Sequence, residues 1–123
     1  MKAYLRFRLV RKWPSDKYIL FIYSESENWS PYIREHIIPK IESNAVIINR
    51  TQQQNWKNEY ALEKHALELW ANLHYNPVAI VFGQRRPKAF LFFEGFRDLK
   101  HGNEQKLQEI CNEFYGYAHL SGV

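Results

Sequence analysis

Few residues of this chain have the types and spacing that catalysis or metal binding requires. Cys111 is the only cysteine and lies on the apolar stripe of a predicted final helix, so we expect a buried core residue rather than a nucleophile. The five histidines include no pair at metal-ligand spacing, which argues against a metal site. No glycine-rich phosphate loop or dinucleotide fingerprint occurs, so the sequence predicts no cofactor.

Three polar residues near position 30 could act on a substrate, but each has a structural interpretation. Ser30 precedes Pro31, a pair typical of an N-cap followed by proline at the first helical position, and no base can be assigned to its hydroxyl. Glu25 and Glu27 lie in the preceding loop, where solvated carboxylates complement the dipole of a following helix. We therefore predict capping and solvation here, and no catalytic residue.

The basic residues are concentrated in two short segments. The chain has 17 Lys and Arg against 13 Asp and Glu, a formal charge of +4, yet residues 1–17 alone hold six bases against one acid. A candidate basic patch for nucleic acid, phosphate or an acidic partner consists of Arg6, Arg8, Arg11, Arg85 and Arg86. The alternative is ordinary solvated surface, because short basic runs at termini and turns usually face water.

Length and composition indicate one folded domain over residues 1–123. With 46% hydrophobic residues and five each of Gly and Pro, the chain is too apolar for disorder and too poor in Gly and Pro for a fibrous protein. A single cysteine forms no internal disulfide, and no apolar run approaches the roughly 20 residues that span a bilayer. Since no signal-peptide core is recognisable either, we expect a cytoplasmic protein without a membrane span.

Four apolar runs predict the strands of one sheet. Uninterrupted runs at residues 18–23, 45–48 and 78–82 are typical of strands buried on both faces. A fourth run at residues 89–93 follows turn signals and predicts the second strand of a hairpin, with Phe93 in the core. Because helices connect the first three strands, we expect those three to be parallel.

Helical spacing predicts two helices between these strands. The first begins at Ser30 and contains regularly spaced isoleucines. The second follows Thr51, whose spacing to Gln54 is that of a capping box, and its apolar face extends to Leu73. Both helices therefore have an apolar side that a sheet can cover.

The two ends of the chain are less regular. Residues 95–102 are expected to be a polar connection, after which a last helix begins near Asn103 and ends at Gly116. Residues 3–13 fit either an extra strand or a helix over the sheet, and both interpretations stay open.

This order of elements resembles the thioredoxin-like fold, whose core is a βαβ unit followed by a ββα unit. The resemblance covers residues 18–115, and its most specific part is NPVAIVFGQRRPKAFLFFEGF at residues 76–96, which is similar to the family's succession of proline, strand, turn, strand and glycine. It implies a central mixed four-stranded sheet with helices on both faces, plus an additional N-terminal element. It also implies a cis peptide bond before Pro77, a form rare enough to be informative.

The chain departs from the family at the motif that carries its chemistry. Redox-active members have Cys-x-x-Cys between the first strand and the first helix, where this chain has ESENWSPY. One alignment puts Trp29 and Tyr32 at the two cysteine positions, and the other puts Pro31 and Arg34 there. Since neither contains a thiol, we expect no thiol–disulfide oxidoreductase activity.

Two classes of function are compatible with these features. The resemblance implies a redox-inactive module that binds a protein or peptide between the first helix and the proline loop, at Trp29, Ser30, Tyr32, Asn76 and Pro77. The alternative is a small basic protein that binds nucleic acid or phosphate through the five arginines of the basic patch. A glutathione-transferase-like enzyme using Ser30 or Tyr32 is disfavoured, because the chain has no room for the usual second helical domain.

Three aromatic residues outside the strands leave two interpretations open. Trp29, Tyr32 and Trp56 either form an exposed apolar patch that grips a partner or simply pack against the sheet. If Trp29 binds a partner, Trp29→Ala is expected to weaken that binding and leave the fold stable.

Overall fold

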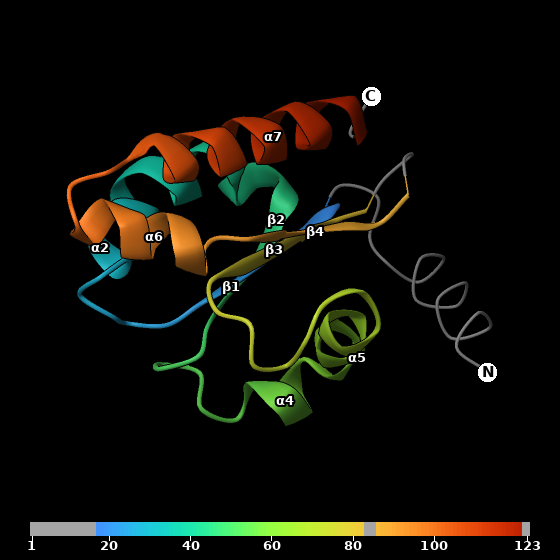
Figure 1. Ribbon diagram of the computed structural model, residues 1–123. Helices are drawn as coiled ribbons and strands as arrows, with labels where there is room; N and C mark the ends of the chain where they lie inside the picture. Colours follow the sequence, from blue (N-terminus) through green and yellow to red (C-terminus); the bar gives the residue numbers. More distant parts are fainter. Residues whose placement is uncertain (1–16, 83–85, 122–123) are drawn as a thin grey trace.

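An α/β structure surrounds one four-stranded mixed sheet, which confirms the expected fold class at this level (Figure 1). The computed structural model describes residues 17–82 and 86–121, and no helix within those ranges is long and apolar enough to cross a membrane. The strand order is β2-β1-β3-β4. The bounds are β1 Ile19–Tyr23, β2 Ala45–Asn49, β3 Val78–Val81 and β4 Lys88–Leu91.

The direction of β3 differs from the prediction. β1 and β2 are parallel as predicted, but β3 is antiparallel to β1, and β4 is antiparallel to β3. Ile48 of β2 and Val78 of β3 both pair with Ile22 of β1. The chain therefore leaves β2 and enters β3 at the same end of the sheet. The prediction was wrong because the connecting segment returns to that end, and an apolar run does not encode strand direction.

The helical segment after β1 changes its hydrogen-bond pattern along its length. It consists of α2 Ser30–Tyr32, a π-helical part η1 Ile33–Ile37, α3 Ile38–Ile41 and a 3₁₀ turn η2 Glu42–Asn44. Pro39 lies in the first turn of α3, where its missing N–H and its ring prevent regular i to i−4 bonding. The irregular part therefore accommodates the proline without ending the helical path.

The single helix predicted after Thr51 is divided into two helices, and both begin later than predicted. They are α4 Trp56–Glu59 and α5 Ala61–Trp70, interrupted at Tyr60. Thr51 does not cap a helix; its Oγ1 accepts a hydrogen bond from the Glu25 N–H at 2.9 Å. The capping-box spacing was misleading because a contact with a distant loop uses the threonine hydroxyl.

The segment predicted to be a polar connection is largely helical. It forms α6, Phe93–Lys100, and is followed by α7, Gln105–Ser121. Gly116 does not end the last helix, which continues to Ser121. Asn103 bonds to the first turn of α7, as predicted: its Oδ1 accepts a hydrogen bond from the Gln105 N–H at 3.1 Å.

Gly95 permits close packing between α6 and α7. A Cβ atom at position 95 would lie 2.9 Å from the Cα of Leu107, closer than such atoms approach in proteins. The turn between the two helices contains Gly102 at a φ of +87°, a conformation that favours glycine. The two glycines thus allow α6 to lie directly against α7.

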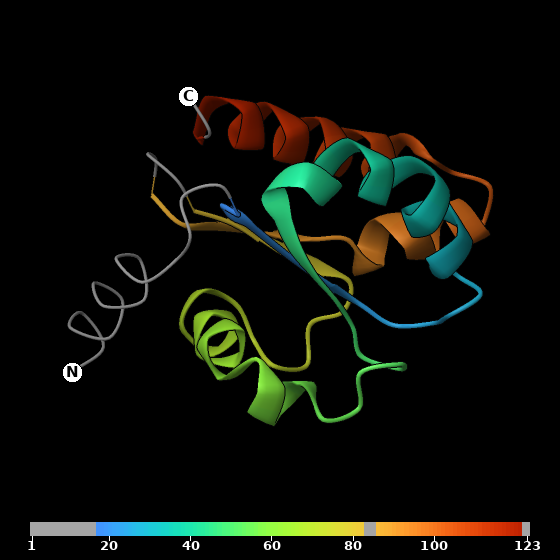
Figure 2. The ribbon, with the colours of Figure 1, turned by 180° about the vertical axis from the view of Figure 1, so that it is seen from behind.

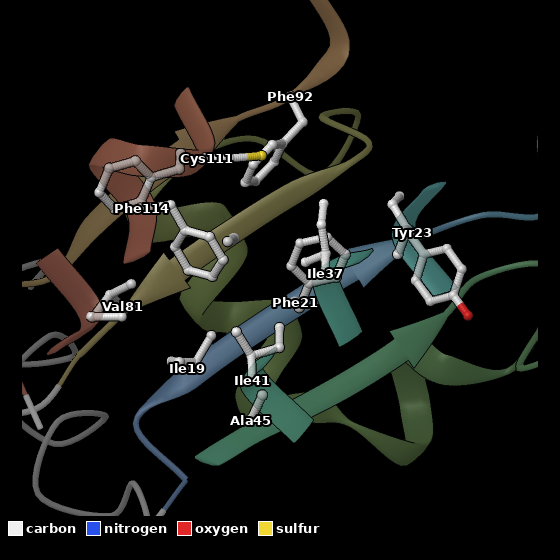
Figure 3. Close-up of a cluster of buried hydrophobic side chains, with 14 of the residues drawn as sticks. Ile19, Phe21, Tyr23, Ile37, Ile41, Ala45, Val81, Phe92, Cys111 and Phe114 are labelled. Carbon is white, nitrogen blue, oxygen red and sulfur yellow. The ribbon is translucent and has the colours of Figure 1, made fainter. Parts of the chain in front are cut away.

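Alternate residues of β1 contribute to two hydrophobic clusters. Phe21 belongs to the first, with buried side chains of α3, α6 and α7 (Figure 3). Leu20 and Ile22 belong to the second, with Trp56 of α4 and Leu67 of α5. Figures 1 and 2 show α7 above the strands and α4 and α5 below them, with α6 beyond the end of β4. The fully buried β1 therefore lies between the two clusters.

Cys111 lies in the first cluster, as predicted (Figure 3). Its side chain belongs to α7 and is 5% exposed. Burial raises the pKa of the thiol to about 11. The cysteine is therefore a protonated core residue at neutral pH.

Candidate functional site

Four chain segments meet at one end of the sheet. The register places the ends of β1, β2 and β4 level with the start of β3. Asn76, in the loop before β3, donates a hydrogen bond from Nδ2 to Ser24 Oγ, in the loop after β1, at 2.8 Å. The two loops predicted to form a binding surface are therefore in direct contact.

A polar cluster centred on Glu25 fixes the loop after β1. The Glu25 carboxylate accepts hydrogen bonds from Ser30 Oγ at 2.8 Å and from Asn49 Nδ2 at 2.7 Å. Arg34 Nη1 donates to the same carboxylate at 2.8 Å. These hydrogen bonds, and then the Arg34 charge, hold the pKa of Glu25 below its ordinary value of 4.5. We refer to Glu25, Ser30, Arg34, Asn49 and Thr51 as the Glu25 cluster.

Ser30 does not have the capping role predicted for it. Trp29 is the N-cap residue, and Ser30 is the first residue of α2. Ser30 is 2% exposed, and its hydroxyl donates a hydrogen bond to Glu25, which was expected to be solvated. The lowered pKa makes that carboxylate a weak base, and the buried hydroxyl is closed to a substrate. The pair therefore anchors the loop and is not arranged for nucleophilic catalysis.

Tyr32 packs against other rings and is not activated for chemistry. Its ring centroid lies 5.6 Å from that of Phe96 and 4.8 Å from that of His36. Burial raises the pKa of the Tyr32 phenol above its ordinary value of 10, whereas a phenol acting as a nucleophile or base needs a lower one. Tyr32, one of the two residues of the disfavoured transferase-like alternative, is thus in an unfavourable setting for that chemistry.

A cavity of about 340 Å³ opens beside Pro77. Its lining residues are His74, Tyr75, Asn76, Pro77, Leu91, Phe93 and Glu94. Three of them are unusually exposed apolar side chains: Tyr75 at 43%, Leu91 at 44% and Phe93 at 53%. The peptide bond before Pro77 is cis, as the resemblance implied. We refer to this opening as the Pro77 cavity.

Asn76 lines the Pro77 cavity, and one polar atom of its side chain is fully buried. Its Nδ2 is bonded to Ser24, but its Oδ1 is buried and has no hydrogen-bond partner within the described ranges. Buried polar atoms are normally paired. The side chain therefore holds the two loops together with only part of its hydrogen-bonding capacity.

Phe93 separates the Pro77 cavity from a second cavity of about 180 Å³. The second cavity is lined by Asn28, Trp29, Phe93, Phe96, Arg97, Lys100 and His101. Trp29 packs edge-on to Phe93 with ring centroids 6.1 Å apart, and its Nε1 donates to the Ser24 carbonyl at 3.0 Å. We refer to the two cavities, with Phe93 between them, as the two-part groove.

The structure places three of the five predicted binding residues in the two-part groove. Asn76 and Pro77 line the first cavity, and Trp29 lines the second. Ser30 and Tyr32 lie nearby but line neither, because the hydroxyl of the one is bonded to Glu25 and the ring of the other packs on Phe96. The groove is therefore displaced toward β4 and α6 from the predicted surface.

Trp29, Tyr32 and Trp56 pack against the hydrophobic clusters rather than project into solvent. Trp56 is 3% exposed within the second hydrophobic cluster. Trp29 and Tyr32 are partly buried against the first. The exposed apolar patch is formed by other residues, those around Phe93.

Most of the basic patch lies outside the described residues. Arg86 is described: it is exposed, and its backbone carbonyl accepts a hydrogen bond from the Tyr117 hydroxyl. The four other candidates lie in residues 1–16 and 83–85, namely Arg6, Arg8, Arg11 and Arg85.

Sequence reasoning missed α6 and the exposed residues of the groove. Phe93 was expected in the core because it ends an apolar run, but β4 stops at Leu91 and Phe93 begins α6. Phe92, Phe96 and Leu99 have helical spacing, which could have predicted this helix. A helix starting at residue 93 would have turned Phe93 away from the sheet.

The comparisons with known proteins gave no match: no family model, curated protein or solved structure matches the chain. Across residues 17–82 and 86–121, no three His, Cys, Asp or Glu side chains are grouped so that they could hold a metal ion. The candidate site is an apolar groove, and basic residues line one part of it.

Proposed function

We propose that this chain is a redox-inactive, thioredoxin-like interaction module that binds a protein or peptide segment in the two-part groove. The strand order β2-β1-β3-β4, with β1 and β2 parallel and β3 and β4 antiparallel to their neighbours, supports the fold assignment. It is the order expected for a βαβ unit joined to a ββα unit. The two hydrophobic clusters that share β1 support helices on both faces.

The chemistry of the only thiol supports the redox-inactive part of the proposal. Disulfide exchange needs an accessible cysteine whose pKa is lowered toward neutrality. Cys111 has the opposite properties, because it is 5% exposed and burial raises its pKa to about 11. Binding without thiol transfer is then the activity that the site can support.

The Pro77 cavity with its three exposed apolar side chains is the observation that carries the proposal. Clustered exposed apolar residues around a cavity are typical of binding sites. Covering the exposed parts of Tyr75, Leu91 and Phe93 is worth about 1 kcal/mol each, or about 3 kcal/mol together. Apolar contact alone would therefore give only weak binding, near the millimolar range.

The outer edge of β4, as far as the sheet is described, gives an extended segment a second means of attachment. In the described part of the sheet, β4 is an outer strand, and Leu91 at its end also lines the Pro77 cavity. Unpaired backbone groups at such an edge can bond to an added strand. A segment paired with β4 would thus place side chains in the cavity.

Selection from a library of random linear dodecapeptides tests this function. Selected peptides are expected to shift the backbone amide NMR signals of Leu91 and Phe93, and Phe93→Ser should weaken their binding at least tenfold. Leu120→Ser is the matched control, because Leu120 is 51% exposed and lies on α7 outside the groove. The proposal fails if no peptide is selected, or if both variants bind selected peptides equally.

A further inference from the structure

We infer that the segment bound in the two-part groove carries an acidic group next to an apolar side chain, and that Arg97 and Lys100 of α6 bind this acidic group. The inference rests on the proposed function and adds the chemistry of the partner. An aspartate, a glutamate or a terminal carboxylate of the partner would supply that group.

The charged residues are unequally divided between the two cavities. Those that line the second cavity, as far as the chain is described, are all basic: Arg97 and Lys100, with His101 beside them. The Pro77 cavity has Glu94, whose carboxylate contacts Lys106 Nζ at 3.1 Å. A partner carboxylate is therefore attracted to the second cavity, where it meets cations that line the same hollow as aromatic rings.

The two cations of the second cavity are available to a ligand. Lys100 has no ion pair within the described ranges. Among the described residues, the one ion pair of Arg97 is a 3.5 Å contact with the adjacent Asp98, and its side chain is 52% exposed. By contrast, Arg34 is 2.8 Å from Glu25 within the Glu25 cluster. Internal pairing thus uses Arg34 and leaves Arg97 and Lys100 able to donate to a partner.

The spacing on α6 places apolar and basic contacts on one face. Phe93, Arg97 and Lys100 are at positions i, i+4 and i+7 of the helix, so their side chains follow one another along it. Cations near a helix C-terminus also complement its dipole. The dipole accounts for the sign of these charges, but it does not account for their lining one cavity with Trp29 and Phe93.

A peptide fits these observations better than a nucleic acid does. Residues 18–123 hold eleven Lys and Arg against twelve Asp and Glu, so this part of the chain has no general excess of positive charge. Nucleic-acid affinity depends on many phosphate contacts. A mainly apolar groove with two available cations instead matches a short segment with a single carboxylate.

The test uses the dodecapeptides selected on the full chain. Each Asp or Glu of the best peptide is replaced by Asn or Gln, and the dissociation constant is measured by calorimetry. One replacement is expected to weaken binding about tenfold, as for the loss of a charge-assisted hydrogen bond. In the double variant Arg97→Ala with Lys100→Ala, the same replacement should change the affinity less than twofold.

Charge reversal provides the control. Lys100→Glu should shift selection from acidic toward basic peptides, whereas Lys57→Glu, the same change at an exposed position of α4, should leave the acidic preference intact. Both positions are at the surface, so neither change is expected to unfold the chain.

Two outcomes would overturn the inference in different ways. Peptides that need Phe93 but bind equally well with Asp or Asn would leave the proposed function standing and remove the acidic partner. Failure to select any peptide, together with salt-sensitive binding of a single-stranded oligonucleotide that Lys100→Glu abolishes, would overturn both the inference and the proposed function.

Discussion

The Glu25 cluster and the two-part groove lie at the same end of the sheet but differ in how their side chains are engaged. In the Glu25 cluster, three side chains donate to one carboxylate at 2.7 to 2.8 Å. In the groove, Phe93 is 53% exposed, and the ion pair that Arg97 forms within the described part of the chain is a 3.5 Å contact with Asp98. Side chains whose polar groups are bonded to one another within the chain hold the loops in place. The neighbouring side chains of the groove are more exposed and can contact a partner.

This difference shows why a position implied by a resemblance does not by itself define a binding residue. Ser30 and Trp29 are neighbours, and both belong to the predicted surface. The Ser30 hydroxyl is bonded to Glu25, whereas Trp29 forms one wall of the second cavity. The partner of each side chain, rather than its place in the sequence, decides which region it belongs to.

Trp29→Ala is expected to have the largest effect, because Trp29 lines the second cavity and its indole is bonded to Ser24, the residue before Glu25. The change removes ring contacts with Phe93 and Phe96 and the hydrogen bond to the Ser24 carbonyl, and should lower the free energy of unfolding by about 3 kcal/mol. This predicted loss differs from the expectation from the sequence that the variant leaves the fold stable. Urea denaturation measures the loss, and a change below about 1 kcal/mol would contradict the packing described.

Gly95→Ala tests whether the position of α6 depends on close contact with α7. The new Cβ would lie 2.9 Å from the Leu107 backbone, so we expect a loss of about 2 kcal/mol in unfolding free energy and weaker peptide binding. Gly116→Ala is the control, because its Cβ meets no atom within 4 Å and the helix gains up to about 1 kcal/mol. Thermal denaturation should therefore shift the two variants in opposite directions.

Ser30→Ala tests whether the Glu25 cluster and the two-part groove are independent, because it changes only the Glu25 cluster. Loss of one hydrogen bond to a carboxylate should cost about 1 kcal/mol of stability, measured by urea denaturation. Affinity for selected peptides should stay within twofold of that of the unchanged chain. A large loss of affinity would mean that the two regions are coupled.

The smallest expected effect is a pH dependence of stability at Glu25. Its pKa is lower in the folded chain than the ordinary 4.5, so its contribution is present above pH 4.5 and is lost as pH falls through the lowered value. Glu25→Gln should therefore be less stable than the unchanged chain at pH 7, and the difference should shrink at pH 3. Urea midpoints at the two pH values measure it, and a constant difference would argue against this carboxylate.

Much of the sheet could be predicted from the sequence, because buried strands leave uninterrupted apolar runs. Residues 19–23 and 45–49 form strands close to the predicted bounds. The direction of β3 could not be predicted, since it depends on where the segment after β2 returns. The extent of β4 was also misjudged, because Phe92 and Phe93 continue its apolar run after the strand has ended.

Within the candidate site, the residues that could be predicted were those that the resemblance to the thioredoxin-like fold had indicated. Asn76 and Pro77 came from the match to the proline loop, and both line the Pro77 cavity. The role of Glu25 was hidden because its partners Asn49 and Thr51 are distant in sequence. Such tertiary hydrogen bonds leave no periodic pattern for sequence reasoning to use.

Because Ile22, Ile48 and Val78 lie level with one another at the groove end of the sheet, a group attached at the opposite end would be distant from the groove. The turn η2, which precedes β2, lies at that other end, and its Ser43 is exposed. A dye or fusion partner joined there would move with the sheet while staying clear of the groove. Since Cys111 is buried, a cysteine introduced at position 43 would be the preferred target of a thiol-reactive label.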